Sequence, residues 1–422
     1  MSLSLLNVRL LSIMRTPKEA ISEILGRIEP ITDTEAVPIK EAAGRILSEQ
    51  VVSDVNLPPF EKSMMDGYAV RAEDATDGPW SLCKLGESRA GEAFEGALGP
   101  GECIAIYTGA EMPAGANAVV MVERTREDGA GLMHSEGQVP PFQNVAHKGE
   151  VLAEGRSVLA AGRRLTPVDL ALLAAVGCDP VPVFRRPRVS ILTTGDELVP
   201  AGTKPGPSQI REGNTVFLAA AAKEAGVELL EIGIVADSRE LLESAFERAF
   251  EAGDVLITTG GVSMGKYDLV GPCLEAIGTE PVLHKVAIKP GKPIWFGVRG
   301  KKPVFGLPGN PVSSLLGFEV FVRPALVRLS GGAAEDQAPR IAIGRWNGGS
   351  KSAAEREINL PVAVTVGEDG VPLLTPVPWK GSADVAGLSS AAGFGIVPAG
   401  TTVECGALIR WRPFACGSTG GW

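Results

Sequence analysis

The sequence predicts a multidomain α/β protein whose central domain holds a doubly wound, mostly parallel sheet. Between residues 186 and 332, apolar strand-like runs alternate with helix-like stretches, which is the pattern of such a sheet. The stretches on either side contain short β-like pieces broken by glycine, proline and asparagine. They predict a β-rich insert domain over 51–154 and a small β-barrel, or alternatively a sandwich, over 333–422. The chain has 422 residues, and a domain takes roughly 150, so several separately packed regions are expected.

The remaining parts of the chain predict a helical linker domain. The run TPKE at 16–19 combines a threonine cap, a proline in the first turn and a glutamate three residues after the cap, which is typical of a helix start. The run TPVD at 166–169 begins another capped helix, and we expect a further short helix over about 40–47. Residues 1–50 together with 155–185 are therefore predicted to form this linker.

Within the α/β region the pattern predicts individual elements. The expected strands are 189–193, 229–235, 254–259, 282–288, 293–298 and 303–306, and the expected helices are 215–225, 239–252, 268–277 and 312–328. In an open α/β sheet, ligands bind outside the carboxyl ends of the strands. That edge is where functional side chains are expected.

Composition excludes several classes of protein. The formal charge is −10, the pI is near 5.1 and aromatic residues make up 5%, so we expect no nucleic-acid partner. The six cysteines form no CxxC pair and there are three histidines, which disfavours a zinc cluster and suits a reducing cytoplasm. The start, MSLSLLNVRLLSIM, is interrupted by Arg9 and is too short to span a bilayer. A soluble, cytoplasmic protein is the expectation.

Polar and glycine-rich motifs follow the expected strands at their carboxyl ends. They are TGDE at 194–197, Asp237, GGVS at 260–263 with Asp268 beyond it, AIKPGKP at 287–293, and LPGNP at 307–311. Amides at a helix start, exposed by glycines, bind phosphate; lysines neutralise it; and carboxylates hold Mg²⁺, which bridges to phosphate oxygens. Together the motifs predict a metal-assisted reaction of a phosphate or oxyanion.

Each motif alone also has a purely structural interpretation. GDE after a strand is commonly a turn and helix cap, KPGKP a solvated basic turn, and LPGNP a tight turn that opens a helix. The functional interpretation depends on all of them sharing one sheet edge. In the insert, LPPFEKSMMDGYAV (57–70) and IYTGAEMPAGANAVVMVE (106–123) place Asp66 and Thr108 on loops of a rigid scaffold. A proline-led surface turn is the alternative there.

Six of these motifs, in order, resemble the MoeA family of molybdopterin molybdenumtransferases, to which the gephyrin E domain is related. They are PPFEKSMMDGYAV, TGAEMPAGANAVVMVE, TTGDEL, GGVSMGKYD, AIKPGKP and LPGNPVS. The resemblance implies molybdenum cofactor biosynthesis: molybdate is inserted into adenylylated molybdopterin with Mg²⁺, and AMP is released. It also implies a homodimer whose active site is shared between subunits. The expected partners also include the molybdopterin adenylyltransferase and the recipient molybdoenzymes. No membrane partner is expected.

The resemblance also implies roles for particular residues. Asp66 and Thr108 match functional positions of the insert, and Glu197, Asp237 and Asp268 match an acidic cluster that is expected to be catalytic and to hold the metal. Glu197 is expected to shape the metal or pterin site. The residues expected to bind the pterin, phosphate or molybdate are Gly260, Gly261, Ser263, Lys285, Lys289, Lys292, Pro308, Gly309, Asn310 and Pro311.

Two segments depart from the family pattern. In NVAHKGEVL (144–152) the family usually has arginines before the glycine and an aspartate after Gly-Glu, where this chain has His147, Lys148 and Val151. Near 211–214, REGN replaces a more usual Asp-x-Asn.

Two other functions stay open from the sequence. One is molybdopterin adenylyltransferase, whose loop usually reads TGGTG where this chain has TGGVSMG. The other is a non-catalytic molybdopterin-binding scaffold.

Overall fold

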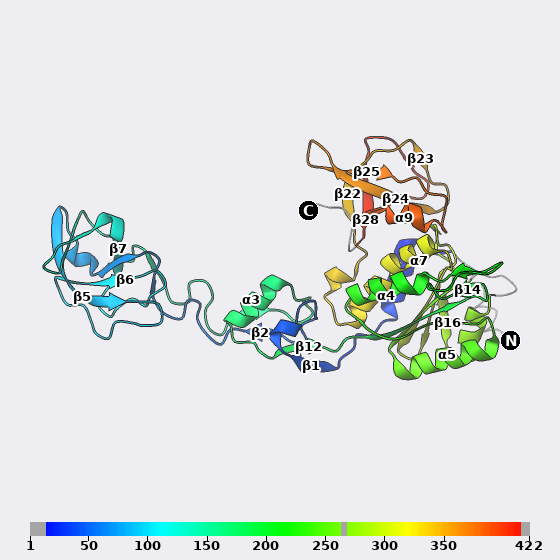
Figure 1. Ribbon diagram of the computed structural model, residues 1–422, viewed down its shortest axis with the longest axis horizontal. Helices are drawn as coiled ribbons and strands as arrows, with labels where there is room; N and C mark the ends of the chain where they lie inside the picture. Colours follow the sequence, from blue (N-terminus) through cyan, green and yellow to red (C-terminus); the bar gives the residue numbers. More distant parts are fainter. Residues whose placement is uncertain (1–13, 263–267, 415–422) are drawn as a thin grey trace.

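The computed structural model describes residues 14–262 and 268–414, and Figure 1 shows them as an extended arrangement of separately packed regions. The β-rich insert lies at one end and the helical linker in the middle. The α/β region lies at the other end, with the C-terminal strands beside it. The predicted fold class is confirmed by the sheets described below.

The α/β region is built on a six-stranded sheet of order β16-β13-β17-β21-β20-β18. Its strands are β13 (Arg188–Thr194), β16 (Glu228–Val235), β17 (Val255–Thr259), β18 (Glu280–Leu283), β20 (Trp295–Arg299) and β21 (Lys302–Leu307). The pairs from β16 to β21 are parallel, and β20 and β18 are added antiparallel. The sheet is therefore mostly parallel, as predicted.

Helices cover both faces of this sheet. They are α4 (Asn214–Glu224), α5 (Arg239–Ala252), α6 (Val270–Ala276), α7 (Pro311–Gly317) and α8 (Arg323–Leu329), with a π-helical turn at Phe318–Val322 joining the last two. Side chains alternate between the faces along each strand. In β17, Val255 and Ile257 pack with α4, α7 and α8, whereas Leu256 packs with α5 and α6.

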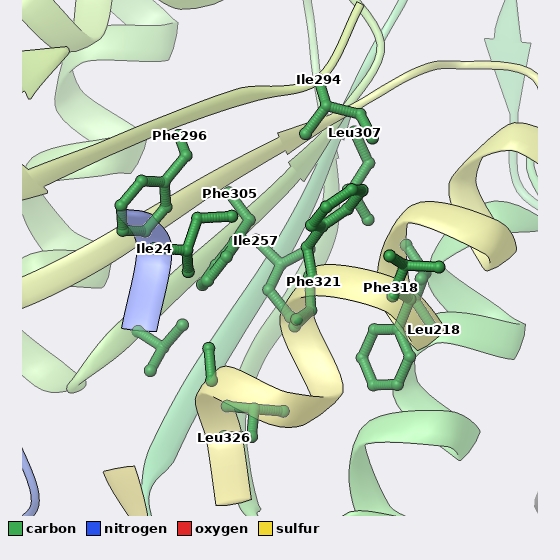
Figure 2. Close-up of a cluster of buried hydrophobic side chains, with 14 of the residues drawn as sticks. Ile24, Leu218, Ile257, Ile294, Phe296, Phe305, Leu307, Phe318, Phe321 and Leu326 are labelled. Carbon is green, nitrogen blue, oxygen red and sulfur yellow. The ribbon is translucent and has the colours of Figure 1, made fainter. Parts of the chain in front are cut away.

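The larger of these two cores also takes in the first helix, α2 (Pro17–Gly26). Ile24 is fully buried beside Phe296 and Phe305 (Figure 2). We grouped residues 1–50 with 155–185 from sequence, but α2 packs on the α/β sheet, because its apolar face meets the strand residues left open by the other helices. The predicted cap is confirmed: the Thr16 side chain accepts from the Glu19 N–H, and the Glu19 carboxylate accepts from the Thr16 N–H.

The linker consists of two small antiparallel pairs and one helix. These are β1 (Thr34–Val37) with β12 (Val181–Phe184), β2 (Val51–Val52) with β11 (Ser157–Leu159), and α3 (Pro167–Ala175), whose capping box at Thr166 is confirmed. The helix predicted over 40–47 is wrong. Only a 3₁₀ turn forms at Ile39–Glu41, because Gly44 takes a positive φ of 72° and Ile46 and Leu47 form β-bridges instead.

The insert contains a six-stranded sheet of order β7-β4-β6-β5-β9-β8. Its strands are β4 (Gly67–Val70), β5 (Pro79–Ser88), β6 (Glu102–Ile106), β7 (Ala118–Met121), β8 (Arg126–Glu127) and β9 (Leu132–Glu136), with β3 (Lys62–Ser63) paired to β10 (Val145–Ala146) alongside. Separate buried clusters pack on its two faces. The insert thus has its own core and holds its loops independently of the α/β sheet.

The C-terminal strands close into the predicted barrel. They run β24-β25-β22-β28-β26, and β26 pairs back to β24. The strands are β22 (Ala342–Trp346), β24 (Glu357–Val366), β25 (Pro372–Pro376), β26 (Gly393–Val397) and β28 (Leu408–Pro413), with β23 (Lys351–Ser352), β27 (Thr402–Val403) and the short helix α9 (Val385–Ser389) beside them.

One strand joins the α/β region to this barrel. The strand predicted over 282–288 is wrong in its second half, because β18 ends at Leu283 and β19 (Ile288–Lys289) pairs with β24 of the barrel. Within the described ranges 14–262 and 268–414, no helix is long and apolar enough to cross a membrane.

We predict that Phe305→Ala destabilises the protein by ~3–5 kcal/mol, because a fully buried ring is replaced by a cavity. Its ring centroid lies 5.0 Å from that of Phe296. Equilibrium urea denaturation of the full chain measures the change. Phe142→Ala, at a ring that is 54% exposed, is the control and should change stability by less than ~0.5 kcal/mol. Equal effects of the two substitutions would contradict this description of the core.

Candidate active site

The predicted motifs meet at the carboxyl edge of the α/β sheet. The register places Thr194 of β13 opposite Val235 of β16, and Thr259 of β17 opposite both Thr193 and Leu307. The loops that follow these strands therefore start side by side. They contain TGDE, Asp237, the glycine pair and LPGNP.

A buried amide ties three of these segments together. Asn214 Nδ2, at the start of α4, donates to Thr259 Oγ1 (3.0 Å) and to the Gly309 carbonyl oxygen (2.6 Å). The Thr259 hydroxyl in turn donates to the Pro308 carbonyl (3.0 Å), which also accepts from Ser314 Oγ (2.9 Å). Asn214 is 8% exposed and Thr259 is fully buried. The LPGNP loop is thus held against the end of β17.

The glycine pair lets the backbones come close at this point. Gly260 has a φ of +92°, and a Cβ there would lie 2.5 Å from the Thr194 carbonyl oxygen. Gly261 has a φ of +60°, and a Cβ there would lie 2.9 Å from the Val270 side chain. Both positions therefore need glycine. Gly309 and Asn310, in the neighbouring loop, are exposed at the same edge.

Acidic residues flank the glycine turn on one side. The Asp237 carboxylate accepts a hydrogen bond from the Thr194 hydroxyl, and the Asp237 N–H donates to Asp196 Oδ1 (3.1 Å). The Glu197 carboxylate folds back over Gly195, where a Cβ would lie 2.7 Å from Glu197 Oε2. Asp237 and the TGDE loop are therefore brought together as expected.

Asp268 follows the same turn in the chain. It lies half-buried just before α6, whose first residue, Val270, donates its N–H to the Gly261 carbonyl (3.2 Å). Ser263, which we predicted to bind the ligand, lies outside the described residues.

The acids do not form a closed metal-binding set on their own. Among residues 14–262 and 268–414, no group of three or more histidine, cysteine, aspartate or glutamate side chains is gathered closely enough to hold a metal ion. Mg²⁺, however, commonly takes one or two carboxylates and completes its shell with water and substrate phosphates. The Asp237 N–H bond to Asp196 brings two aspartates to this edge of the sheet, as that mode needs. Sequence reasoning singled out Glu197 and passed over Asp196 in the same TGDE motif.

The lysines lie on the loop between β18 and β20. Val286 N donates to the Lys292 carbonyl (3.1 Å), and a Cβ on Gly291 would lie 3.5 Å from the Ser313 carbonyl of α7. This packing places the loop beside the helix that LPGNP opens. Lys289 and Lys292 are exposed, and neither has an ion-pair partner in the described part of the chain. Lys285 is half-buried, and its carbonyl accepts from the Arg15 N–H.

The barrel contributes a contact that sequence reasoning missed. Asn310 Nδ2 donates to Ser382 Oγ (3.0 Å), and Val312 N donates to the Ser382 carbonyl (3.0 Å). Pro308 is buried and Pro311 is the first residue of α7, so the loop between them is held from both sides. The only sequence signal for Ser382 is the glycine before it, in the turn after Trp379.

Asp66 and Thr108 come together on the insert. The Thr108 N–H and its hydroxyl each donate to Asp66 Oδ1 at 2.7 Å. These two bonds, the backbone one first, hold the pKa of the Asp66 carboxyl below its usual value. Within one chain, however, the insert lies beyond the helical linker from the α/β sheet (Figure 1). These two residues therefore do not join the other predicted site residues in a single subunit.

The segment that departs from the family pattern is locally satisfied. The Glu150 carboxylate accepts from the His147 N–H (2.7 Å), and the His147 ring contacts Glu61 (2.9 Å). Val151, where the family usually has an acid, is 77% exposed. Glu150 is thus engaged in its own turn.

Comparisons with known proteins identify the family to which the chain belongs. A family model for the MoeA N-terminal region (domain I and II) matches residues 15–177, one for a probable molybdopterin binding domain matches 190–328, and one for the MoeA C-terminal region (domain IV) matches 348–414. The chain belongs to the MoeA family. The resemblance that the motifs indicated is confirmed.

Similar proteins cover most of this MoeA-family chain. It is 37% identical over 318 residues to the molybdopterin molybdenumtransferase of Haemophilus influenzae, covering 75% of this chain and 78% of the relative. It is 34% identical over 376 residues to that of Bacillus subtilis, covering 87% of each. The crystal structure of a molybdopterin biosynthesis MoeA protein from Pyrococcus horikosii superposes with a TM-score of 0.80 at 34% identity, covering 97% of this chain and all of that one.

We predict that Asn214→Ala destabilises the protein by ~1–3 kcal/mol, because the buried Thr259 hydroxyl and the Gly309 carbonyl both lose their donor. Urea denaturation of the full chain measures the change. Asn347→Ala is the matched control, since the Asn347 amide is exposed and donates to Thr375 Oγ1 (3.0 Å). A loss for Asn214→Ala no larger than for Asn347→Ala would show that the amide does not hold the loop.

We predict that Thr108→Val raises the pKa of Asp66 toward its ordinary value, because the hydroxyl donor is lost while the N–H remains. Carboxyl-carbon NMR titration measures it. A carboxyl whose folded-state pKa is lowered stabilises the fold above its unfolded pKa, and that contribution is lost as the pH falls through the folded value. The variant should therefore lose less stability than the wild type on acidification. Thr125→Val, whose hydroxyl donates to the Val122 carbonyl, should leave the pKa of Asp66 unchanged; an unchanged value in Thr108→Val would reject the assignment.

Proposed function

We propose that this protein completes the molybdenum cofactor: it binds adenylylated molybdopterin and molybdate, inserts molybdenum at the dithiolene and releases AMP. The observation that carries the proposal is the convergence of Asp237, the 260–261 glycine turn and the 308–310 loop at one sheet edge. Curated relatives that are 37% and 34% identical carry the name molybdopterin molybdenumtransferase. The site therefore combines an anion cradle with acids, which suits cleavage of a phosphoanhydride.

The chemistry requires two anions to be brought together. Lys289 and Lys292, exposed beside α7, lower the repulsion between the pterin phosphates and molybdate. The backbone around Gly260, Gly261 and Gly309 provides close approach for phosphate or molybdate oxygens. Holding both reactants in one cleft contributes to the rate by removing the entropy cost of their encounter, up to ~7–11 kcal/mol in well-oriented cases.

We assign the divalent metal to the acidic side of this sheet edge. Asp237 and Asp268 would hold Mg²⁺, and Glu197 would shape the metal or pterin site. When bound, Mg²⁺ neutralises phosphate charge and polarises the phosphorus–oxygen bond. The Thr194 hydroxyl, which donates to Asp237, orients that carboxylate for this task.

The active site is shared between two copies of the chain. Asp66 and Thr108 form one exposed, preorganised pair on the insert, and the sheet edge holds the other residues (Figure 1). Because the linker separates the insert from the sheet edge within a subunit, Asp66 and Thr108 of one copy act at the sheet edge of its partner. The homodimer is therefore the functional unit.

The reaction lies between two other steps of the same biosynthesis. An adenylyltransferase supplies the activated pterin, and molybdoenzymes receive the product. We place it in the cytoplasm, where thiols stay reduced. The described cysteines 83, 103, 178, 273 and 405 are free.

The direct test uses purified protein with adenylylated molybdopterin, molybdate and Mg²⁺. AMP is measured by chromatography and the cofactor by reconstitution of a cofactor-free molybdoenzyme. Product in both assays is expected. Adenylylation of molybdopterin from ATP would instead identify an adenylyltransferase, and binding without turnover a scaffold.

We predict that Asp268→Ala folds normally but lowers metal-dependent AMP release by ~10²-fold or more, because a charge that faces the reacting phosphates is removed. Asp369→Ala is the control, since this aspartate pairs with Arg345 on the barrel surface, and it should retain full activity. Full turnover by Asp268→Ala would remove this residue from the mechanism.

We predict that mixing Asp66→Ala protein with Asp268→Ala protein restores activity, because hybrid dimers contain one intact site. Up to about a quarter of wild-type turnover is expected from random exchange at equal concentrations. Subunit exchange is followed by native mass spectrometry. Exchange without restored activity would mean that the site lies within one chain.

A further inference from the structure

Two chain crossings connect the helical linker to the α/β region, and Arg185 contacts both. It lies on the second crossing, just after β12. Its N–H donates to the Asp33 carbonyl (2.9 Å) and its Nε to the Asp33 carboxylate (3.2 Å), and Asp33 lies on the first crossing, just before β1. One residue therefore binds the two crossings to each other.

The same guanidinium also reaches the sheet. Its two terminal nitrogens donate to the two carboxylate oxygens of Asp254 at 2.7 and 3.0 Å. Asp254 immediately precedes β17 and also accepts from the Arg188 N–H (2.7 Å). Burial raises the pKa of Asp254, but these bonds outweigh it and keep the pKa below its usual value. A two-point arginine–carboxylate contact of this kind fixes direction as well as distance.

Two further contacts brace the joint. Arg164 of the linker donates to the Ala225 carbonyl at the end of α4 (2.7 Å) and to the Gly44 carbonyl (3.2 Å). The Gly162 carbonyl accepts from the Ala333 N–H beyond α8 (3.0 Å). The linker is thus attached to the α/β region at separate points around Arg185, which resists rotation.

We propose that Arg185 is a positioning residue for the reaction: it fixes the angle between the linker and the α/β sheet and thereby places Asp66 and Thr108 of each subunit at the partner's sheet edge. This inference rests on the proposed function. The insert lies beyond the linker (Figure 1), so a small rotation at the joint moves the insert by a larger distance. A misplacement of ~1 Å at a reacting centre costs ~10²-fold in rate.

The position of the joint separates this role from direct participation. Arg185 binds at the amino end of β17, whereas the glycine turn follows the carboxyl end of the same strand. Its removal therefore leaves the sheet-edge contacts of Asn214 and Asp237 in place. Loss of a purely stabilising ion pair would lower the melting temperature without changing the angle between the linker and the sheet.

The test measures the angle directly. Spin labels are attached at Val168→Cys in α3 and Leu241→Cys in α5, both exposed. Cys83, Cys178, Cys405 and Cys416 are replaced by serine, and labelled chains are mixed with excess unlabelled ones. Pulsed electron resonance gives the distance distribution within a subunit. Arg185→Ala should broaden it at least about twofold and lower kcat at least about tenfold, with KM changed by less than about threefold.

Two matched variants control the result. Arg345→Ala removes an ion pair on the barrel surface and should change neither the distribution nor kcat. Arg185→Lys keeps the charge but loses the two-point contact, so an intermediate broadening and an intermediate kcat are expected. It also serves as the test if Arg185→Ala does not fold. An Arg185 variant with a distribution as narrow as that of Arg345→Ala, or with a broad one and full kcat, overturns the proposal.

A double-mutant cycle tests the link to the insert. If Arg185 acts by placing Asp66, the two substitutions should not act independently. The fold-decrease in kcat that Asp66→Ala causes in the Arg185→Ala background should then be less than about a third of the fold-decrease that it causes in the wild type. Multiplicative effects would show that the two residues act independently and would overturn the positioning role. A wild-type protein that makes no cofactor at all overturns the proposed function instead, whereas the distance distribution still decides whether Arg185 fixes the joint.

Discussion

The buried side-chain amide of Asn214 is the contact on which the candidate site depends. It donates to the end of β17 and to the LPGNP loop at once, so two chain segments that are about 50 residues apart are held at one place. The buried Thr259 hydroxyl extends the same network to Pro308. The Asn214 amide and the Thr259 hydroxyl are buried, so losing a hydrogen-bond partner would be costly for either group. These bonds therefore favour one position of the loop. The glycine turn can then lie directly against it.

This fixed edge explains how opposite charges are gathered at one edge of the sheet. Acids come from the loops after β13 and β16, and the lysines come from the loop that packs on α7. On the barrel side, Ser382 accepts a hydrogen bond from the Asn310 side chain. The pairing of β19 with β24 joins the lysine loop to the barrel. The barrel is therefore part of the framework of the site, and we propose that Arg185 sets where the partner's insert meets it.

Local signals in the sequence predicted much of this fold. Thr16 and Thr166 both cap helices as expected, and the strand–helix alternation gave the parallel sheet and its functional edge. The failures occurred where long-range pairing decides the local structure. Residues 40–47 form bridges to Arg164 and Val183 rather than a helix, and β19 leaves its expected strand because β24 offers a better partner. Neither pairing has a signal within its own segment.

The site residues divide in the same way. Asp237 and the glycine pair follow strands, so periodicity was enough to predict their neighbourhood. Ser382 and Asp196 were missed, because no motif marks the first and the second stands beside a more prominent glutamate. Asn214 immediately precedes the helix predicted over 215–225, but its two hydrogen bonds depend on tertiary structure. Arg185 lies in a basic run whose partners, Asp33 and Asp254, are distant in sequence.

The most direct test of the shared opening is a crystal structure of the protein with Mg²⁺, AMP and molybdate. We expect anomalous density for molybdenum between the 260–261 turn and the 308–310 loop, with Asp237 and Asp268 facing the same opening and Asp66 of the partner copy at its rim. Molybdenum bound elsewhere, with these carboxylates directed to different sides of the sheet, would contradict the account.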